Sequence, residues 1–97
     1  MDLLFEWDAN KANLNKHKVS FEEAKTVLND PLLITFPDEE HSKVEDRFIS
    51  IGMSAMRRLL LVVHTEHEAT KKSIVIRLIS CRKTMASERR VYEEGKG

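Results

Sequence analysis

The chain has 97 residues, a formal net charge of zero and one cysteine, Cys81. This length suits one domain, which we place at residues 1–97, and a single cysteine excludes an internal disulfide and fits a reducing cytoplasm. The N-terminus shows no targeting segment, and the longest apolar run, residues 59–63, is far shorter than the roughly 20 residues needed to cross a bilayer. A disulfide scaffold and a transmembrane protein are therefore not expected.

The charges are unevenly distributed along the chain. Residues 1–46 carry five Lys and eleven acidic residues, whereas residues 47–92 carry ten Lys or Arg and three Glu. All seven arginines lie between Arg47 and Arg90. Arginine is suited to forked contacts with phosphate, so this asymmetry predicts a basic surface for an anionic partner such as nucleic acid. A charge-balanced soluble surface is the alternative.

The N-terminal part of the chain predicts a short strand or extended lead-in followed by two helices. The strand covers residues 3–7. Asp8 can cap a first helix that continues to His17, because its carboxylate accepts hydrogen bonds from the free amides of a helix start. Ser20 opens a second helix, with Glu23 completing a capping box. The Asn-Asp-Pro sequence at residues 29–31 ends this helix.

The rest of the chain predicts an antiparallel meander and a closing helix. Four strands are expected at residues 32–36, 47–53, 59–65 and 73–81. An acidic loop covers residues 37–46, and turns cover residues 54–57 and 67–72. Thr84 can cap a last helix that runs to Glu94. The predicted class is therefore α+β, a curved antiparallel sheet packed against two N-terminal helices and a C-terminal helix.

Arg77 is the most informative residue, because it interrupts a strand that otherwise reads as interior. Side chains alternate between the two faces of a strand. Ile74, Ile76 and Leu78 are therefore expected to face the helices, and Arg77 and Cys81 are expected to face the other way. A charge in mid-strand is costly unless it is paired or faces water. Two readings are open: an ion pair with a neighbouring carboxylate such as Glu66, or a phosphate-binding arginine on an open sheet face.

Further basic residues follow Arg77 closely. Arg82 and Lys83 end the strand, and Arg89 and Arg90 lie in the last helix. Because the strand leads directly into that helix, these four side chains could form one basic cluster with Arg77. A solvated helix surface is the alternative for the helical pair.

Histidine and tyrosine supply the remaining candidates. His17 follows Lys16 at the end of the first predicted helix, where it can cap the helix or act in acid–base chemistry. His64 and His67 point to opposite faces of a strand, so no metal site is predicted. Tyr92 lies on the helix of the arginine pair and could stack on a base.

Taken together, these residues form a pattern that resembles the BrnT toxin family. The resemblance spans almost the whole chain and is specific as a combination. Lys18 stands where such proteins usually have Gly, so the turn there is expected to be strained or shaped differently, and Cys81 stands where a smaller residue is common. The matching residues are Phe5–Asp8, Asn13-Leu14, Lys16-His17, Val19, Phe21, Glu23-Ala24, Asp30-Pro31, Phe36, Asp38, Glu45, Arg47-Phe48, Ile51-Gly52, Leu59–Glu66, Ile76-Arg77, Ile79-Ser80, Arg82-Lys83, Glu88-Arg89 and Tyr92.

The resemblance implies a fold similar to RelE-type ribonucleases. It also implies a type II toxin that cleaves RNA and inhibits translation and growth. Its partner would be a co-expressed antitoxin that also binds operator DNA, in a complex with two copies of each subunit. No cofactor and no metal are expected. The runner-up is a non-enzymatic α+β module that binds protein or nucleic acid through the arginine-rich half.

RNA carries its own nucleophile, the 2′-hydroxyl, so such an enzyme must move two protons and stabilise charge on the phosphoryl oxygens. The hypothesis assigns charge stabilisation to Arg77 and Arg82. Proton transfer falls to His17 or Lys16, with Glu45 as the other candidate base. The expected RNA contacts are Arg47, Lys83, Arg89, Arg90 and Tyr92.

Overall fold

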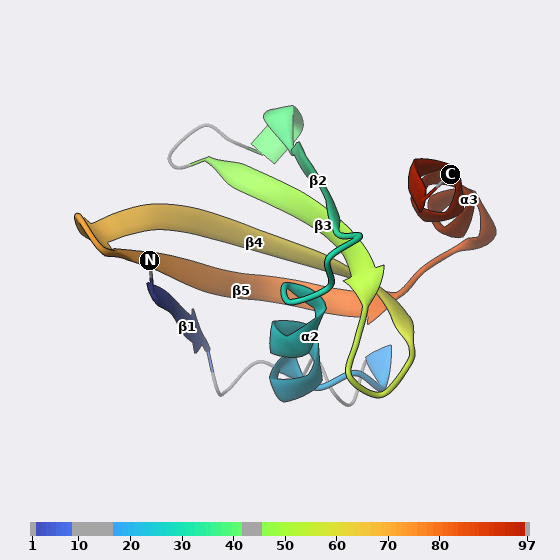
Figure 1. Cartoon of the computed structure of the whole chain (residues 1–97), viewed down its shortest axis with the longest axis horizontal. Coiled ribbons are helices and arrows are strands. Elements are labelled where there is room, and N and C mark those ends of the chain that lie inside the picture. Colours follow the sequence, from blue (N-terminus) through green and yellow to red (C-terminus); the bar gives the residue numbers. More distant parts are fainter. Residues whose placement is uncertain (1, 9–16, 42–45, 97) are drawn as a thin grey trace.

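The computed structural model describes residues 2–8, 17–41 and 46–96. Five strands form one sheet in the order β1-β5-β4-β3-β2, accompanied by two helices (Figure 1). The elements are β1 (Asp2–Trp7), α2 (Phe21–Val27), β2 (Ile34–Pro37), a 3-10 turn (Glu39–His41), β3 (Arg47–Met53), β4 (Leu59–Thr70), β5 (Ser73–Lys83) and α3 (Ala86–Lys96).

The α+β class is confirmed, but the sheet is mixed rather than antiparallel. The meander β2-β3-β4-β5 is antiparallel throughout. β1 pairs with β5 in parallel. No hairpin turn joins these two strands, so nothing forces them to run in opposite directions. The sequence therefore predicted the strand at the N-terminus but not the orientation of its pairing.

Of the two expected N-terminal helices, the structure gives bounds for one, α2. Most of the other predicted helix, from Asp8 to His17, falls on residues 9–16, which lie outside the described residues. Ser20 caps α2 as predicted, because its hydroxyl accepts from the Glu23 amide at 3.1 Å. The Glu23 carboxylate instead binds Ser54 and Arg58, because it lies beneath the β3–β4 turn.

β4 and β5 are longer than predicted and form a projecting hairpin (Figure 1). β4 continues to Thr70, so residues 67–70 belong to a strand rather than to the predicted polar turn, which shrinks to Lys71 and Lys72. Backbone pairing with β5 continues through this polar stretch, because ladder hydrogen bonds do not require apolar side chains. β3 has the predicted bounds.

A β-bulge changes the facing of the last part of β5. The register between β4 and β5 shifts at Ile79, which has no opposite residue on β4. One extra residue reverses the face on which all later side chains lie. Cys81 therefore lies on the α2 face, where its thiol approaches the Val19 carbonyl oxygen at 3.8 Å. The expectation that it shares a face with Arg77 is corrected.

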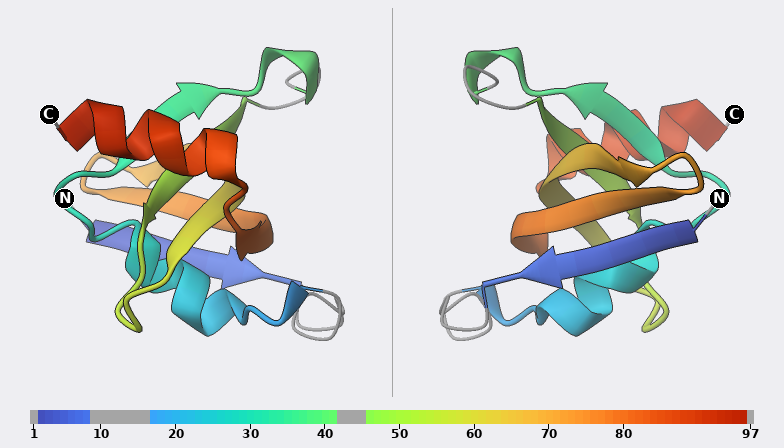
Figure 2. Two further views of the ribbon diagram at one scale, coloured as in Figure 1. Left: turned by 90° about the vertical axis from the view of Figure 1, so that its right-hand side faces the viewer. Right: turned by 90° about the vertical axis from the view of Figure 1, so that its left-hand side faces the viewer.

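The two helices lie on opposite faces of the sheet (Figure 2). α3 covers only one end of its face, where Tyr92 packs on β3 and β4. The rest of that face has no covering helix among the described elements. The α2 cluster contains Val19, Phe21, Ala24, Val27, Leu60, Val62, Ile76, Leu78 and Cys81, and the α3 cluster contains Ile51, Leu59, Leu61 and Tyr92.

Candidate functional site

The open part of the α3 face carries a row of polar side chains that crosses four strands. Arg77 on β5 lies opposite Thr65 on β4, and Thr65 lies opposite Arg47 on β3. On the other side, Arg77 lies opposite Glu6 on β1. Neighbouring strands are about 4.8 Å apart, so the backbones of Arg77 and Arg47 are separated by about 10 Å. The sheet thus brings two of the predicted phosphate contacts onto one face.

Arg77 is held there by a weak surface ion pair. Its Nη1 lies 3.4 Å from Glu6 Oε1, and the two side chains are 46% and 48% exposed. Glu66, the partner proposed from the sequence, lies opposite Ile76 and so on the other face. An exposed pair of this kind contributes roughly 0–1 kcal/mol. A phosphate can therefore replace the Glu6 carboxylate at little cost.

Thr65 stands between the two arginines and was missed by sequence reasoning. It is 1% exposed, and its Oγ1 is buried with no hydrogen-bond partner among the described residues. Buried hydroxyls are normally satisfied, so this one is an exception, and its burial keeps it out of reach of a group bound at the surface. Threonine is a common strand residue, and no pattern in the sequence marks this one.

Arg82, the second predicted charge-stabilising arginine, lies away from this row. Its two terminal nitrogens donate to the carboxylate of Glu88 at 2.8 and 2.7 Å, and Glu88 also accepts from the Met85 amide at 2.8 Å. The Arg82 hydrogen bonds hold the pKa of Glu88 below its usual value. Five residues along a strand place Arg82 about 15 Å from Arg77. In this structure Arg82 fixes the start of α3.

Lys83 and Arg89 line a pocket of about 320 Å³ at the end of the sheet. We call it the basic pocket; its residues are Arg57, Arg58, Leu59, Lys83, Thr84 and Arg89. Arg57 and Arg58 were not among the predicted site residues, although two adjacent arginines in a tight turn between strands are a recognisable signal. Arg90 is exposed on α3 and does not line this pocket.

His17 lies near this end of the molecule, next to Lys18. The Lys18 carbonyl accepts from an Arg58 terminal nitrogen at 3.3 Å. Lys18 has a φ of 61°, a left-handed conformation that favours Gly, so the strained turn implied by the resemblance is confirmed. Lys16 and Glu45, the other two proton-transfer candidates, lie outside the described residues.

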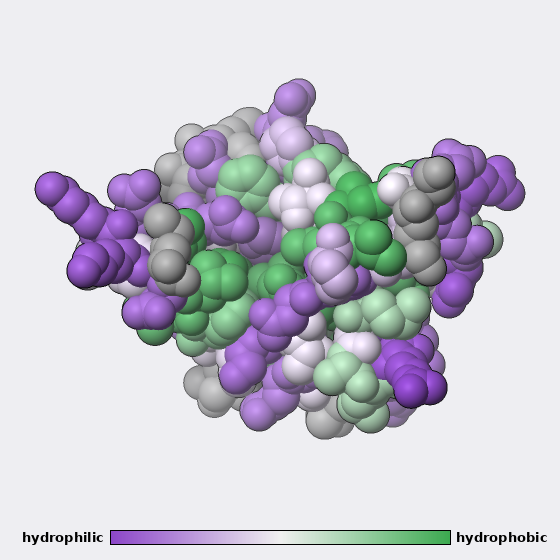
Figure 3. Space-filling model, viewed as in Figure 1, coloured by the Kyte–Doolittle hydropathy of each residue, from purple (hydrophilic) through white to green (hydrophobic). Residues whose placement is uncertain are grey.

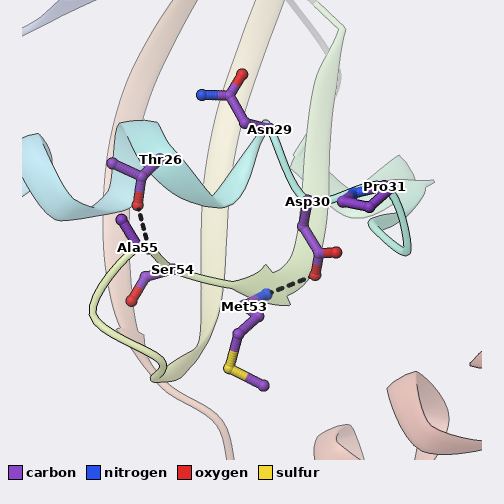
Figure 4. Close-up of a pocket in the computed structure, with 7 residues that line it drawn as sticks. All are labelled: Thr26, Asn29, Asp30, Pro31, Met53, Ser54 and Ala55. Carbon is purple, nitrogen blue, oxygen red and sulfur yellow. Dashed lines mark hydrogen bonds between the residues drawn. The ribbon is translucent and has the colours of Figure 1, made fainter.

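A second pocket, of about 340 Å³, lies between the end of α2 and the β3–β4 turn (Figure 4). Hydrophobic side chains gather nearby, between β2 and α3 (Figure 3). Asp30 in its wall accepts from the Met53 amide at 2.7 Å, and Thr26 accepts from the Ala55 amide at 2.9 Å. None of its lining residues is basic, and these polar atoms are already bonded within the protein. It is therefore poorly suited to a phosphate.

Tyr92 does not belong to the RNA contacts that the sequence suggested. The side chain is 3% exposed and packs in the α3 cluster, and its hydroxyl donates to Asp30 Oδ2 at 2.6 Å. Burial, together with the hydrogen bond to Asp30, raises the pKa of Tyr92 to about 12. A buried ring has no face on which a base can stack, so we assign Tyr92 to the core.

Tyr92→Phe should lower the free energy of unfolding by about 2 kcal/mol, because it removes one hydrogen bond to a carboxylate while keeping the ring. Urea denaturation measures this change. Val91→Ala is the matched control, since Val91 is a neighbour on α3 and 46% exposed, and it should change stability little. Equal effects of the two substitutions would contradict the core role of the Tyr92 hydroxyl.

A comparison with known families gives one match. A family model described as "Ribonuclease toxin, BrnT, of type II toxin-antitoxin system" matches residues 7–88. The match includes Arg47, Thr65 and Arg77 and ends before Arg89. The comparison with curated proteins gives no match. No helix in the described part of the chain is long and apolar enough to cross a membrane.

Proposed function

Because the chain belongs to the BrnT family of ribonuclease toxins of type II toxin–antitoxin systems, we propose that it cleaves RNA on the open sheet face at Arg77. Membership of a ribonuclease family sets aside the alternative of a non-enzymatic binding module. The observation that supports this location is that Arg77 and Arg47 lie on one face of the sheet, on the strands to either side of β4.

In the proposed reaction the 2′-oxygen of the RNA attacks the adjacent phosphorus and the bond to the 5′-oxygen breaks. The products are a 2′,3′-cyclic phosphate and a 5′-hydroxyl. Arg77 and Arg47 stabilise the negative charge on the phosphoryl oxygens from two sides. No metal takes part.

Of the three predicted proton-transfer groups, His17 lies at the end of the sheet that carries the basic pocket, so we assign proton transfer at Arg77 to Lys16 and Glu45. One of these groups removes the 2′-hydroxyl proton, and another protonates the leaving 5′-oxygen. Arg82 would have to exchange Glu88 for a phosphate to stabilise charge directly. Lys83, Arg89 and Arg90 are assigned to RNA binding.

We further propose that the protein acts in the cytoplasm, where cleavage inhibits translation and growth. A cognate antitoxin would neutralise it in a complex of two toxin and two antitoxin subunits, and would link the complex to operator DNA. The arrangement of helices on a curved sheet is in keeping with a RelE-like ribonuclease.

The test is incubation of the purified chain with a defined single-stranded RNA in EDTA. We expect cleavage with 2′,3′-cyclic phosphate ends, and no cleavage of the same RNA carrying a 2′-O-methyl group at the cleaved nucleotide. Cleavage of the methylated RNA would overturn 2′-hydroxyl attack, and a requirement for added Mg²⁺ would overturn the metal-independent reaction. If the free RNA stays intact, the assay is repeated on translating ribosomes, where an intact message would refute the proposal.

A further inference from the structure

The basic pocket combines cations from three separate segments of the chain. Arg57 and Arg58 come from the β3–β4 turn, Lys83 from the end of β5, and Arg89 from α3. These segments meet only in the folded protein. The pocket therefore has a defined shape and is not simply a basic stretch of sequence.

The pocket carries more positive charge than its carboxylate partners neutralise. Arg58 is paired with buried Glu23, and Arg89 has an exposed partner, Glu93, at 3.8 Å. Arg57 and Lys83 have no carboxylate within ion-pair distance among the described residues. The charge of Lys83 also helps to lower the pKa of Glu23. The four cations of the pocket therefore share two carboxylates, Glu23 and Glu93, and the remaining positive charge favours an anionic ligand.

The turn that presents Arg57 and Arg58 is rigidly held. The Ser54 hydroxyl donates to Glu23 at 2.7 Å, and the Arg57 amide donates to the Ser54 carbonyl at 2.9 Å. Arg57 itself has a φ of 61°, a left-handed conformation that is unfavourable for a residue with a Cβ atom. Strain of this kind is often kept where a side chain must be presented to a ligand.

We propose that the basic pocket binds a second phosphate of the RNA substrate, several nucleotides from the one cleaved at Arg77. Lys83 lies six residues along β5 from Arg77, or about 20 Å, so one phosphate cannot contact both. The guanidinium groups of Arg57 and Arg58 match the oxygens of a phosphodiester. A contact to backbone phosphate adds affinity and position without reading the base sequence. The inference rests on the proposed function for its choice of ligand.

The test is binding of 2′-O-methyl oligonucleotides, which this enzyme would not cleave, by fluorescence anisotropy. A 12-mer and a trimer are compared with wild-type protein, Arg57→Gln and Lys83→Gln. Each pocket variant should bind the 12-mer about 10-fold more weakly and reduce the salt dependence of binding by about one counter-ion. Trimer binding should be unchanged, because a trimer does not span the two sites.

Lys71→Gln is the matched control, since it removes the same charge from the exposed tip of the β4–β5 hairpin, at the far end of β5 from the pocket. The proposal would be overturned if Lys71→Gln, Arg57→Gln and Lys83→Gln bound the 12-mer with equal affinity. It would also be overturned if the pocket variants lost as much affinity for the trimer as for the 12-mer. An acidic peptide serves as a second anionic probe. Pocket variants that bind the 12-mer normally but lose affinity for this peptide would also overturn the proposal. Circular dichroism melting identifies a variant that fails to fold. If Arg57→Gln does not fold, the 12-mer affinity of Lys83→Gln decides the test.

Arg57→Gly separates presentation of the side chain from the shape of the turn. Glycine adopts a positive φ without strain, so this variant should melt at a higher temperature than Arg57→Gln and still bind the 12-mer weakly. Recovery of wild-type binding by Arg57→Gly would overturn the role of the guanidinium. These readouts do not depend on cleavage: an inactive chain whose 12-mer binding requires Arg57 and Lys83 would refute the proposed reaction but keep the pocket.

Discussion

Arg77→Ala should reduce RNA cleavage by at least about 100-fold while the domain stays folded. Removing one preorganised donor to a developing oxyanion typically costs about 10²–10³ in rate. The cost to stability should be small, because the ion pair of Arg77 with Glu6 is exposed at both ends and contributes roughly 0–1 kcal/mol. Cleavage rate and thermal unfolding, measured on the same preparation, separate the two effects.

Glu6→Gln provides the control for the loss of the ion pair alone. It removes the partner of Arg77 but leaves the guanidinium on the open face, so cleavage should be retained. Arg77→Lys keeps the charge and loses the forked geometry, and should fall between wild type and Arg77→Ala. Wild-type cleavage by a folded Arg77→Ala protein would remove this residue from the site.

The location of Arg77 was predictable because strand alternation depends only on neighbours in sequence. The two-residue alternation of side chains along a strand predicted that Ile76 and Leu78 pack against a helix and that Arg77 lies on the opposite face. The structure has this arrangement. Its proximity to Arg47 was not predictable. That contact depends on the registers of β3, β4 and β5, and no single strand sequence contains them.

Other parts of the site escaped prediction for related reasons. The bulge at Ile79 reverses the facing of Cys81, and a run of apolar residues carries no mark of one unpaired position. The basic pocket required the β3–β4 turn to meet the start of α3, which is a tertiary contact. The parallel pairing of β1 with β5 joins segments about 70 residues apart, and no turn sequence connects them.

His64 is a buried titratable group whose ionisation is coupled to folding. It is 1% exposed, and its Nε2 shares a hydrogen bond of 2.7 Å with the Ser50 hydroxyl, which in turn bonds Thr35 at 2.8 Å. The Phe48 ring stacks on the imidazole with centroids 5.9 Å apart. Burial lowers the pKa of His64 to about 4. The imidazole is therefore neutral near pH 7 and cannot serve as a cationic RNA contact.

This lowered pKa predicts that the protein loses stability in mild acid. In the unfolded chain the pKa returns to about 6.5, so below that pH the unfolded state binds the proton that folded His64 refuses. The stabilisation is complete above about pH 6.5 and is lost as the pH falls to about 4. A difference of about 2.5 pKa units corresponds to about 3 kcal/mol. Burial raises the pKa of Glu66, which acts in the opposite direction, so the slope of the wild type alone reports their sum.

A comparison of variants isolates the histidine. Urea unfolding between pH 4 and 8 should show a steep loss of stability for the wild type and a flatter profile for His64→Gln, because the glutamine side chain does not titrate. His67→Gln is the control, because His67 is exposed three residues further along β4, and it should keep the steep profile. Two results would contradict this: a free energy of unfolding that falls as steeply with pH in His64→Gln as in the wild type, or a fall that disappears in His67→Gln. Either result would show that the acid sensitivity does not come from the His64 imidazole that Ser50 holds.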